Sequence, residues 1–214
     1  MSALHDRLAA VHGRIVSAGR DPQEVTIVAV TKGFDASVCS AAVAAGLRVL
    51  GENRVHEALT KMSVVPDAEW HLIGHLQTNK VRTAAGRFAL IQSVDSARLA
   101  EHIARVTTEQ PVLVEVNISR EPQKAGVDPD RAVDVVAEVA DMLDVQGLMA
   151  MGPATGDPTP AFEEVRRLRD AAEQRVGKRL PVLSMGMSGD FEAALTAGST
   201  MLRLGQVLFG PRPA

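Results

Sequence analysis

Short apolar, β-branched runs alternate along this chain with segments in which apolar residues recur at positions i, i+3 and i+4. The runs are typical of buried strands, and the second spacing is typical of helices that bury one face. Aspartate or serine precedes several helical segments and could cap their first turns. The predicted strands are Val25–Val30, Arg48–Leu50, Trp70–Ile73, Leu90–Ser93, Val112–Asn117, Val145–Ala150, Val182–Met185 and Met201–Leu204. The predicted helices are Leu4–Ala18, Ala36–Ala45, Arg54–Met62, Thr78–Ala85, Ala97–Thr108, Pro129–Leu143, Pro160–Val176 and Gly189–Ala197.

Eight strands that alternate with helices predict an α/β fold of parallel βα units, and we expect a single (β/α)8 TIM-type barrel. A doubly wound open sheet is the alternative, because periodicity alone does not show closure. The last strand is followed only by residues 206–214, too few for a full eighth helix. We expect helix Leu4–Ala18 to fill that gap in the outer ring. No linker or low-complexity segment interrupts the pattern, so one domain should span residues 1–214.

The composition narrows the class of protein. A chain of 214 residues with 46% hydrophobic residues suits one compact domain, and its net charge of −3 gives no reason to expect nucleic acid or an acidic membrane surface as a partner. No run approaches the roughly 20 apolar residues of a membrane span, and the polar start of the chain has no signal-peptide core. Cys39 is the only cysteine, which excludes an internal disulfide and a zinc cluster. We therefore expect a cytoplasmic protein without a metal site.

Two strand-to-helix turns near the C-terminus have the composition of a phosphate cradle. Each leads from an apolar strand through small residues into a helix start, where backbone N–H groups and the helix dipole favour an anion. Ser188 belongs to the first turn, and Gly205 and Gln206 belong to the second. Barrels commonly bind phosphate at their last two strands. Alternatively, Ser188 is an ordinary N-cap and Gly205 only a strand-end turn.

Lys32 follows the apolar strand Val25–Val30 and should be partly desolvated. Desolvation lowers the pKa of a lysine and favours its neutral, nucleophilic form. A lysine together with a phosphate cradle indicates a phosphorylated aldehyde held as a Schiff base, as in the chemistry of pyridoxal 5'-phosphate (PLP). From its position alone, a solvated lysine in a loop would be the favoured interpretation, and only the phosphate cradle shifts the balance to the Schiff base.

Arg203 lies among apolar neighbours within the last predicted strand, where an inward arginine is costly unless it is paired. It could donate a hydrogen bond to the pyridine nitrogen of PLP. Because a guanidinium does not give up its proton, that nitrogen would stay unprotonated and the ring would be a poor electron sink. The competing interpretation is a structural ion pair with Glu115 or Glu52.

Four further residues could face the mouth of a barrel, where the carboxyl ends of the strands meet. Asn53 and Asn117 are candidate polar contacts, and we place His71 in the barrel near its mouth. Met149, like Met151, Met185 and Met187, is most simply part of the barrel packing, although these methionines could also form an apolar wall beside a cofactor ring.

These residues fall in motifs that run in order over nearly the whole chain, and the most specific are Ser184–Ser188 and Trp70–Lys80. On the basis of these motifs, the chain resembles the pyridoxal phosphate homeostasis protein family. The other matching segments are Thr31–Lys32, Leu50–Asn53, Glu115–Ser119, Lys124–Val127, Gly147–Met149 and Gly198–Gly210.

The resemblance implies a barrel similar to the N-terminal domain of bacterial alanine racemase, with the Schiff base on Lys32. It implies that Ser188 and the backbone of Gly205 and Gln206 hold the phosphate, and that Arg203 meets the pyridine nitrogen. It also places Asn53, His71, Asn117 and Met149 in family motifs near the cofactor. The implied function is intracellular PLP (vitamin B6) and amino-acid homeostasis by a carrier or regulator without catalysis of its own, with PLP-requiring apo-enzymes as partners. We expect a monomer, because the sequence shows no large exposed apolar stripe.

Two alternative functions remain at this point. One is a PLP-dependent enzyme with weak amino-acid racemase or lyase activity, with Lys32 and His71 as bases. The other is a barrel that binds a phosphorylated metabolite without a Schiff base. Racemases of this barrel type use a tyrosine as second base, and this chain contains no tyrosine. The absence of tyrosine favours the carrier.

Overall fold

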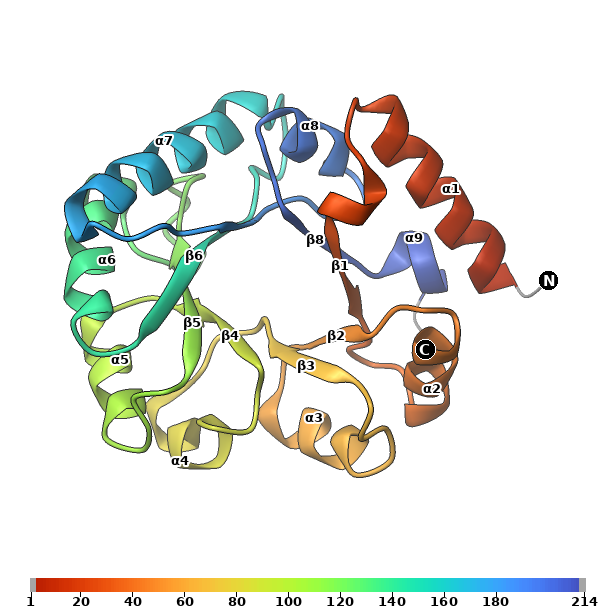
Figure 1. The fold of residues 1–214 in the computed structure, drawn as a ribbon, viewed down its shortest axis with the longest axis horizontal. Helices are drawn as coiled ribbons and strands as arrows, with labels where there is room; N and C mark the ends of the chain where they lie inside the picture. The colour runs from red at the N-terminus through yellow and green to blue at the C-terminus, as the bar shows by residue number, and fades with distance from the viewer. Residues whose placement is uncertain (1–2, 212–214) are drawn as a thin grey trace.

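Eight parallel strands form a closed barrel in sequence order, and helices surround it (Figure 1). The computed structural model describes residues 3–211, so residues 1–2 and 212–214 of the predicted domain lie outside the described residues. Closure comes from the first and last strands, since Thr26, Ile27, Val28 and Ala29 pair in parallel with Met201, Leu202, Arg203 and Leu204. The predicted TIM-type barrel is confirmed, and the open-sheet alternative is wrong.

The observed elements follow the predicted alternation. The strands are β1 Thr26–Val30, β2 Val49–Glu52, β3 Glu69–Leu72, β4 Leu90–Val94, β5 Pro111–Val116, β6 Asp144–Ala150, β7 Val182–Ser184 and β8 Met201–Leu204. The α-helices are α1 Ala3–Ser17, α2 Ala36–Ala44, α3 Val55–Met62, α4 Val81–Ala84, α5 Ala97–Ala104, α6 Ala132–Ala140, α7 Thr159–Val176, α8 Phe191–Thr196 and α9 Gln206–Phe209. Short 3₁₀ turns are η1 Pro22–Glu24, η2 Thr78–Lys80 and η3 Pro129–Arg131.

The largest differences from the predicted elements are at helix ends. Two predicted helices each begin with a 3₁₀ turn, η2 and η3, and the side chain of Asp128 caps η3 by accepting from the N–H of Asp130. Helix α8 begins at Phe191 rather than at Gly189, because the Asp190 side chain accepts from the N–H of Met187, 2.6 Å away, and closes a turn ahead of the helix. Residues 188 and 189 therefore belong to a loop at the barrel end.

Helix α1 completes the outer ring beside α8 and the short α9 (Figure 1). Arg14 pairs with Glu192 of α8 at 2.5 Å, and its guanidinium lies over the ring of Phe191, 4.2 Å from the centroid. Arg7 donates to the carbonyl of Leu208 in α9. The predicted role of the N-terminal helix is confirmed.

The barrel interior has an apolar cluster of its own, separate from the core between strands and helices. It is built from alternate inward positions of the strands, as close-packed barrel interiors are. Its buried members are Val28, Leu90, Leu113, Met149 and Met201. This layer closes the barrel below the mouth, so a ligand can enter only above it.

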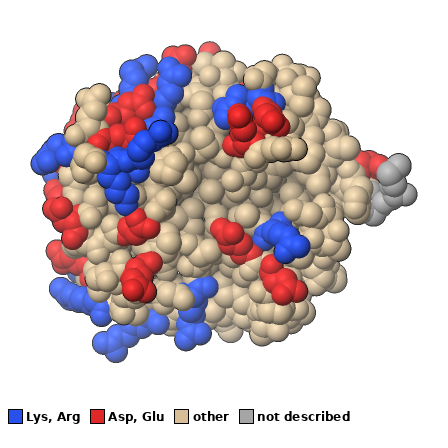
Figure 2. All heavy atoms as spheres, in the orientation of Figure 1, with Lys and Arg blue, Asp and Glu red and all other residues tan. Residues whose placement is uncertain are grey.

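The distribution of surface charge and the polarity of the helices can be compared with those of charged binding surfaces and membrane spans. Figure 2 shows acidic and basic side chains of the described residues interspersed on the face seen in Figure 1, so neither sign forms a continuous field there. Among residues 3–211, no helix is both long and apolar enough to cross a membrane.

Gly186 fixes the path of the chain from β7 towards the barrel mouth. Its φ of +93° is one that L side chains rarely adopt, and an added Cβ would lie 2.8 Å from the Cβ of Ala194 and 2.9 Å from the Cα of Phe191. The carbonyl of Gly186 also accepts from the N–H of Arg203 in β8. Glycine at this position therefore lets the loop of residues 187–189 pack against α8 and lie beside the end of β8.

Candidate functional site

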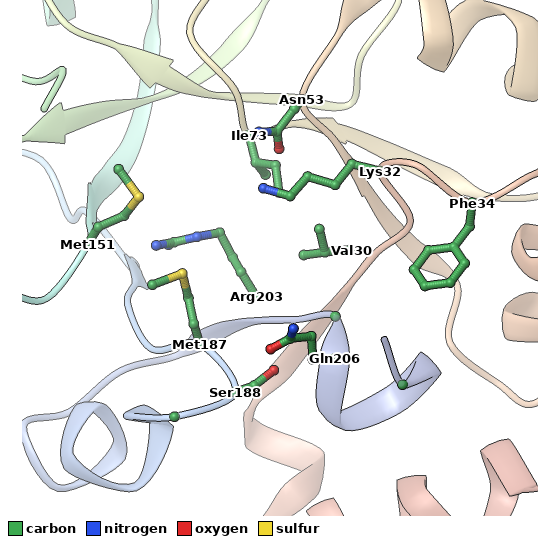
Figure 3. A pocket seen from close by; sticks show the side chains of 13 residues that line it. Val30, Lys32, Phe34, Asn53, Ile73, Met151, Met187, Ser188, Arg203 and Gln206 are labelled. Atoms are coloured by element: carbon green, nitrogen blue, oxygen red, sulfur yellow. The ribbon is translucent and has the colours of Figure 1, made fainter. Parts of the chain in front are cut away.

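A cavity of about 360 Å³ opens at the carboxyl ends of the barrel strands, and six of the nine predicted site residues line it. Figure 3 shows the side chains of Lys32 and Arg203 directed into the same space, with the Ser188 hydroxyl and the Gln206 side chain at another side of it. The six are Lys32, Asn53, Ser188, Arg203, Gly205 and Gln206. The structure thus brings together groups from β1, β2, β8 and the loop after β7.

Lys32 follows β1 and is flanked by backbone groups that a buried ion-pair network holds. The ammonium of Lys61 in α3 donates to the carbonyl of Thr31 at 2.8 Å and to the carboxylates of Glu52 and Glu57 at 2.6 and 2.7 Å. Glu57 also accepts from the N–H of Gly33 at 2.7 Å. The residues on both sides of Lys32 are therefore fixed to α3.

The charges in this network stabilise one another. Burial raises the pKa of Glu52, against the opposing hydrogen bonds from Lys61 and Thr31. Burial alone would lower the pKa of Lys61, but its hydrogen bonds with Glu52 and Glu57 raise it. Lys61 is therefore a structural cation, although sequence reasoning did not single it out. Its spacing of four residues from Glu57 was the available signal.

Arg203 is buried at the end of β8 and is held by backbone rather than by carboxylates. Its Nη1 donates to the carbonyl and the hydroxyl of Ser184 at 2.6 and 2.7 Å, and its Nη2 donates to the carbonyl of Ala150 at 2.8 Å. Desolvation lowers the pKa of the guanidinium to about 10, which leaves it charged at neutral pH. The ion pair with Glu52 that we considered does not form, because Glu52 pairs with Lys61. Glu115 favours the charge of Arg203 electrostatically, but among residues 3–211 no salt bridge joins the two side chains.

The opposite side of the cavity offers hydroxyl and backbone donors. The Ser188 hydroxyl accepts from the N–H of Val207 at 3.3 Å, which joins the loop after β7 to the first turn of α9. Gly189, Gly205 and Gln206 line the cavity beside it. The N–H at the start of a helix has no acceptor within the helix, so the N–H of Gln206 is available to an anion.

The remaining walls are mostly apolar. Val30 and Ile73 line the cavity near Lys32, and Met151 and Met187 line it beside the guanidinium of Arg203 (Figure 3). Met151 and Met187 were considered from the sequence as barrel packing or as an apolar wall, and the structure places both in the cavity lining. Val30 and Ile73 were not predicted as site residues, and only their position at or just beyond a strand end signalled that they could reach the mouth. Such walls suit a flat, largely apolar ring.

Asn53 is placed by a close backbone contact. A Cβ added to Gly74 would lie 2.3 Å from the carbonyl oxygen of Asn53, so only glycine lets the chain after β3 approach the end of β2 this closely. The side chain of Asn53 lies near Lys32 in the cavity (Figure 3).

The other three predicted residues lie outside the cavity lining. His71 is buried deeper in the barrel, between Gln92 and Glu69. Met149 belongs to the apolar layer of the interior, which agrees with its simpler interpretation as barrel packing. The amide of Asn117 donates to the carbonyls of Glu121 and Lys124, so it shapes its own loop. Among residues 3–211, no group of three His, Cys, Asp or Glu side chains is arranged to hold a metal ion.

Glu115 in β5 should make the stability of the fold depend on pH. Burial raises its pKa from 4.5 to about 7, although Arg203 acts in the opposite direction. The folded state holds the proton of Glu115 more tightly than the unfolded state does. The stabilisation that this protonation gives to the folded state is therefore complete below pH 4.5 and is lost as pH rises through 7. We expect the wild type to lose about 3 kcal/mol of unfolding free energy relative to Glu115→Gln over this interval, measured by urea denaturation at a series of pH values. Parallel pH profiles for the two proteins would contradict this expectation.

Comparisons with known proteins give the same fold and the same family. The family model described as alanine racemase, N-terminal domain, matches residues 6–213. The pyridoxal phosphate homeostasis protein of Aquifex aeolicus (strain VF5) is 38% identical over 97% of this chain and 97% of its own. The structure of PipY from Synechococcus elongatus PCC7942 with PLP bound has a TM-score of 0.85 and 34% identity over 97% of this chain and all of that chain.

A more distant structure shows the shared fold only. Alanine racemase from Corynebacterium glutamicum superimposes with a TM-score of 0.77 at 19% identity, over 99% of this chain and 61% of that one. The near full-length matches at 34–38% identity decide the closer relationship. The chain belongs to the pyridoxal phosphate homeostasis protein family, within the alanine racemase N-terminal domain fold.

Proposed function

We propose that this protein binds PLP in the cavity at the barrel mouth and takes part in PLP homeostasis. The observation that carries the proposal is the convergence of Lys32 and Arg203 on one cavity whose far side is lined by Ser188 and Gln206 (Figure 3). The relatives' names and the PLP-bound PipY structure support the same ligand.

The residues present fit this ligand by their chemistry. PLP has an aldehyde, a phosphate, an aromatic ring and a pyridine nitrogen, and each has a suitable partner in the cavity. Lys32 supplies an amine for the aldehyde, and Arg203 supplies a guanidinium for the pyridine nitrogen. A hydroxyl and backbone N–H groups for the phosphate come from Ser188 and Gln206, and apolar walls for the ring come from Ile73 and Met187. The volume of about 360 Å³ is within the range of small-molecule sites.

Each residue then has a defined role. The amine of Lys32 would hold the cofactor covalently but reversibly through its aldehyde carbon, with loss of one water. Ser188 and the backbone of Gly205 and Gln206 donate hydrogen bonds to the phosphate. Arg203 already donates three hydrogen bonds, two to Ser184 and one to the carbonyl of Ala150. One of its remaining N–H groups donates to the pyridine nitrogen. The side-chain amide of Asn53 can donate or accept a hydrogen bond with the ligand beside Lys32. Bound PLP would supply an electrophilic carbon at which other amines can replace the amine of Lys32.

A carrier or regulator fits these roles better than an enzyme does. A buried guanidinium donates its protons without releasing them, so the pyridine nitrogen stays unprotonated and the ring withdraws electrons weakly. The chain also has no tyrosine to act as a second base. We propose a monomer that works in the cytoplasm and exchanges PLP with PLP-requiring apo-enzymes. Weak amino-acid racemase or lyase activity is the second candidate, favoured by the alanine racemase-like fold.

The test of PLP binding uses the wild-type protein. After incubation with PLP we expect a yellow protein that sodium borohydride bleaches, with one reduced pyridoxyl group found by peptide mass mapping on the peptide that contains Lys32. A reduced group on another lysine, or none with PLP in excess, would overturn the proposal.

Carrier and enzyme are separated by exchange at the α-carbon. The PLP-loaded protein is incubated in deuterium oxide with a panel of amino acids, and deuterium at the α-carbon is measured by mass spectrometry. A carrier gives no exchange above free PLP, whereas turnover well above free PLP would support the enzyme.

A further inference from the structure

A chain of buried side-chain hydrogen bonds runs through the barrel interior from Arg203 to the end opposite the cavity. Arg203 Nη1 donates to the Ser184 hydroxyl at 2.7 Å, and that hydroxyl donates to Gln92 Oε1 at 2.6 Å. Gln92 Nε2 lies 2.9 Å from Nδ1 of His71, and Nε2 of His71 lies 3.0 Å from a carboxylate oxygen of Glu69. Glu69 is the first residue of β3, with its side chain 55% exposed, so the chain ends in solvent at the far end of the barrel.

The two ends of this chain determine the direction of every hydrogen bond in it. A guanidinium can only donate, and an ionised carboxylate can only accept. The hydrogen bond from His71 lowers the pKa of Glu69, which keeps the carboxylate ionised. A neutral His71 therefore carries its proton on Nε2 and presents a bare Nδ1.

The remaining members follow from that tautomer. A bare Nδ1 needs a donor, so Gln92 turns its amide N–H towards His71 and its carbonyl towards Ser184. The Ser184 proton then points at Gln92, and the oxygen lone pairs of Ser184 face Arg203. With a neutral His71, a single arrangement of protons satisfies all five residues, as buried polar groups require.

Arg203 depends on this arrangement. All three middle members are almost fully buried, at 0% exposure for Gln92 and Ser184 and 2% for His71. Loss of Gln92 would leave the proton of Ser184 without its acceptor, and the hydroxyl would turn to find another. Its lone pairs would then no longer be fixed towards Nη1, and the guanidinium would lose one of the contacts that hold it at the cavity.

We propose that Ser184, Gln92 and His71 are positioning residues that orient and polarise Arg203 for the pyridine nitrogen, through a hydrogen-bond chain of fixed direction that ends at Glu69. This inference rests on the proposed function for the identity of the ligand, but not for the existence of the chain. It also gives His71 a role: the residue acts on the cofactor site from within the barrel, without contact to the cavity.

The first test measures the proton on His71 without any ligand. In ¹⁵N-labelled wild-type protein, long-range imidazole spectra at neutral pH should show one histidine locked as the Nε2–H tautomer, assigned by its disappearance in His71→Gln. Glu69→Ala should release this lock, because Nε2 of His71 then loses its acceptor, and the signal should move towards the mixture of tautomers that free imidazole shows. A proton on Nδ1 of His71 in the wild type would overturn the proposal.

The second test measures the effect on PLP. Gln92→Leu should weaken PLP binding about 10-fold, since a buried group is left unpaired beside Arg203, and should shift the visible absorption band or its pH titration. Gln110→Leu is the matched control, because Gln110 is equally buried but bonds Phe88, Pro111 and Gly86 away from the cavity. We expect Gln110→Leu to lower stability and to leave affinity and spectrum unchanged.

The outcomes separate the two proposals. Equal PLP affinity and spectra in Gln92→Leu and Gln110→Leu would overturn the positioning role, even though the wild type binds PLP. If the wild type does not bind PLP, the proposed function and the role towards its nitrogen both fail, and the tautomer spectrum still decides whether the chain exists.

Discussion

Replacement of Lys32 by alanine is expected to abolish the borohydride-reducible adduct and to weaken PLP binding at least about 100-fold, equal to about 2.7 kcal/mol. The proposed phosphate and ring contacts at Ser188, Gln206 and Arg203 are not altered by this substitution, so residual binding reports what they contribute alone. Only the covalent bond to the aldehyde carbon is removed. Affinity is measured by absorption titration, and the adduct by intact mass after reduction.

Lys178→Ala is the control for this experiment. Lys178 is exposed and pairs with Asp144 at the start of β6, at the end of the barrel opposite the cavity. The variant should match the wild type in affinity and in the mass of the reduced adduct. If Lys32→Ala binds PLP as tightly as the wild type, the cavity binds a phosphate ester without a Schiff base, and the proposed role of Lys32 is lost.

The fold could be predicted because its signal is local and repeated. Each buried strand is a short apolar run, and each helix has its own apolar face, so eight repeats indicate a barrel even where single boundaries are off by a few residues. Closure itself depends on the pairing of β1 with β8, which no local pattern encodes. It was inferred only from the number of units.

Two of the predicted residues, His71 and Met149, lie away from the cavity because of their position along their strands. His71 and Ile73 face the same side of β3 and its extension, and only Ile73 reaches the cavity. Likewise Met149 fills the interior layer, and Met151, two residues further on, lines the cavity. Alternation predicts which way a side chain faces, but the depth depends on strand tilt and stagger, which the sequence pattern does not contain.

Asn117 lies outside the cavity for a different reason. An asparagine that follows a strand can satisfy neighbouring backbone groups instead of a ligand, and this one bonds the carbonyls of Glu121 and Lys124. Lys32 and Arg203 could be chosen from the sequence because a charged residue beside an apolar run is unusual in itself. An amide at a turn is common, so its residue type carries much less information.

Lys61→Met is expected to lower the free energy of unfolding by about 3–5 kcal/mol, because it removes one partner of a buried ion pair. The Glu52 side chain has 0% exposure, and its Oε1 accepts from Lys61 at 2.6 Å and from the Thr31 hydroxyl at 2.7 Å. Its Oε2 has no hydrogen-bond partner within residues 3–211. Without Lys61, the carboxylate would be left as a buried charge with one hydroxyl partner. Urea denaturation at pH 7 measures the loss.

Two further variants identify the cause of the loss. Adding Glu52→Gln to Lys61→Met removes the unpaired charge and should recover part of the stability, whereas Lys178→Met, which breaks a half-exposed pair with Asp144, should cost at most about 1 kcal/mol. The penalty of Lys61→Met should also shrink as pH falls. Burial raises the pKa of Glu52 above its unfolded value, so protonation neutralises the carboxylate in the folded state first. A penalty below about 1 kcal/mol, or one that is the same at pH 5 and pH 8, would show that the network around Lys32 does not depend on the charge of Lys61.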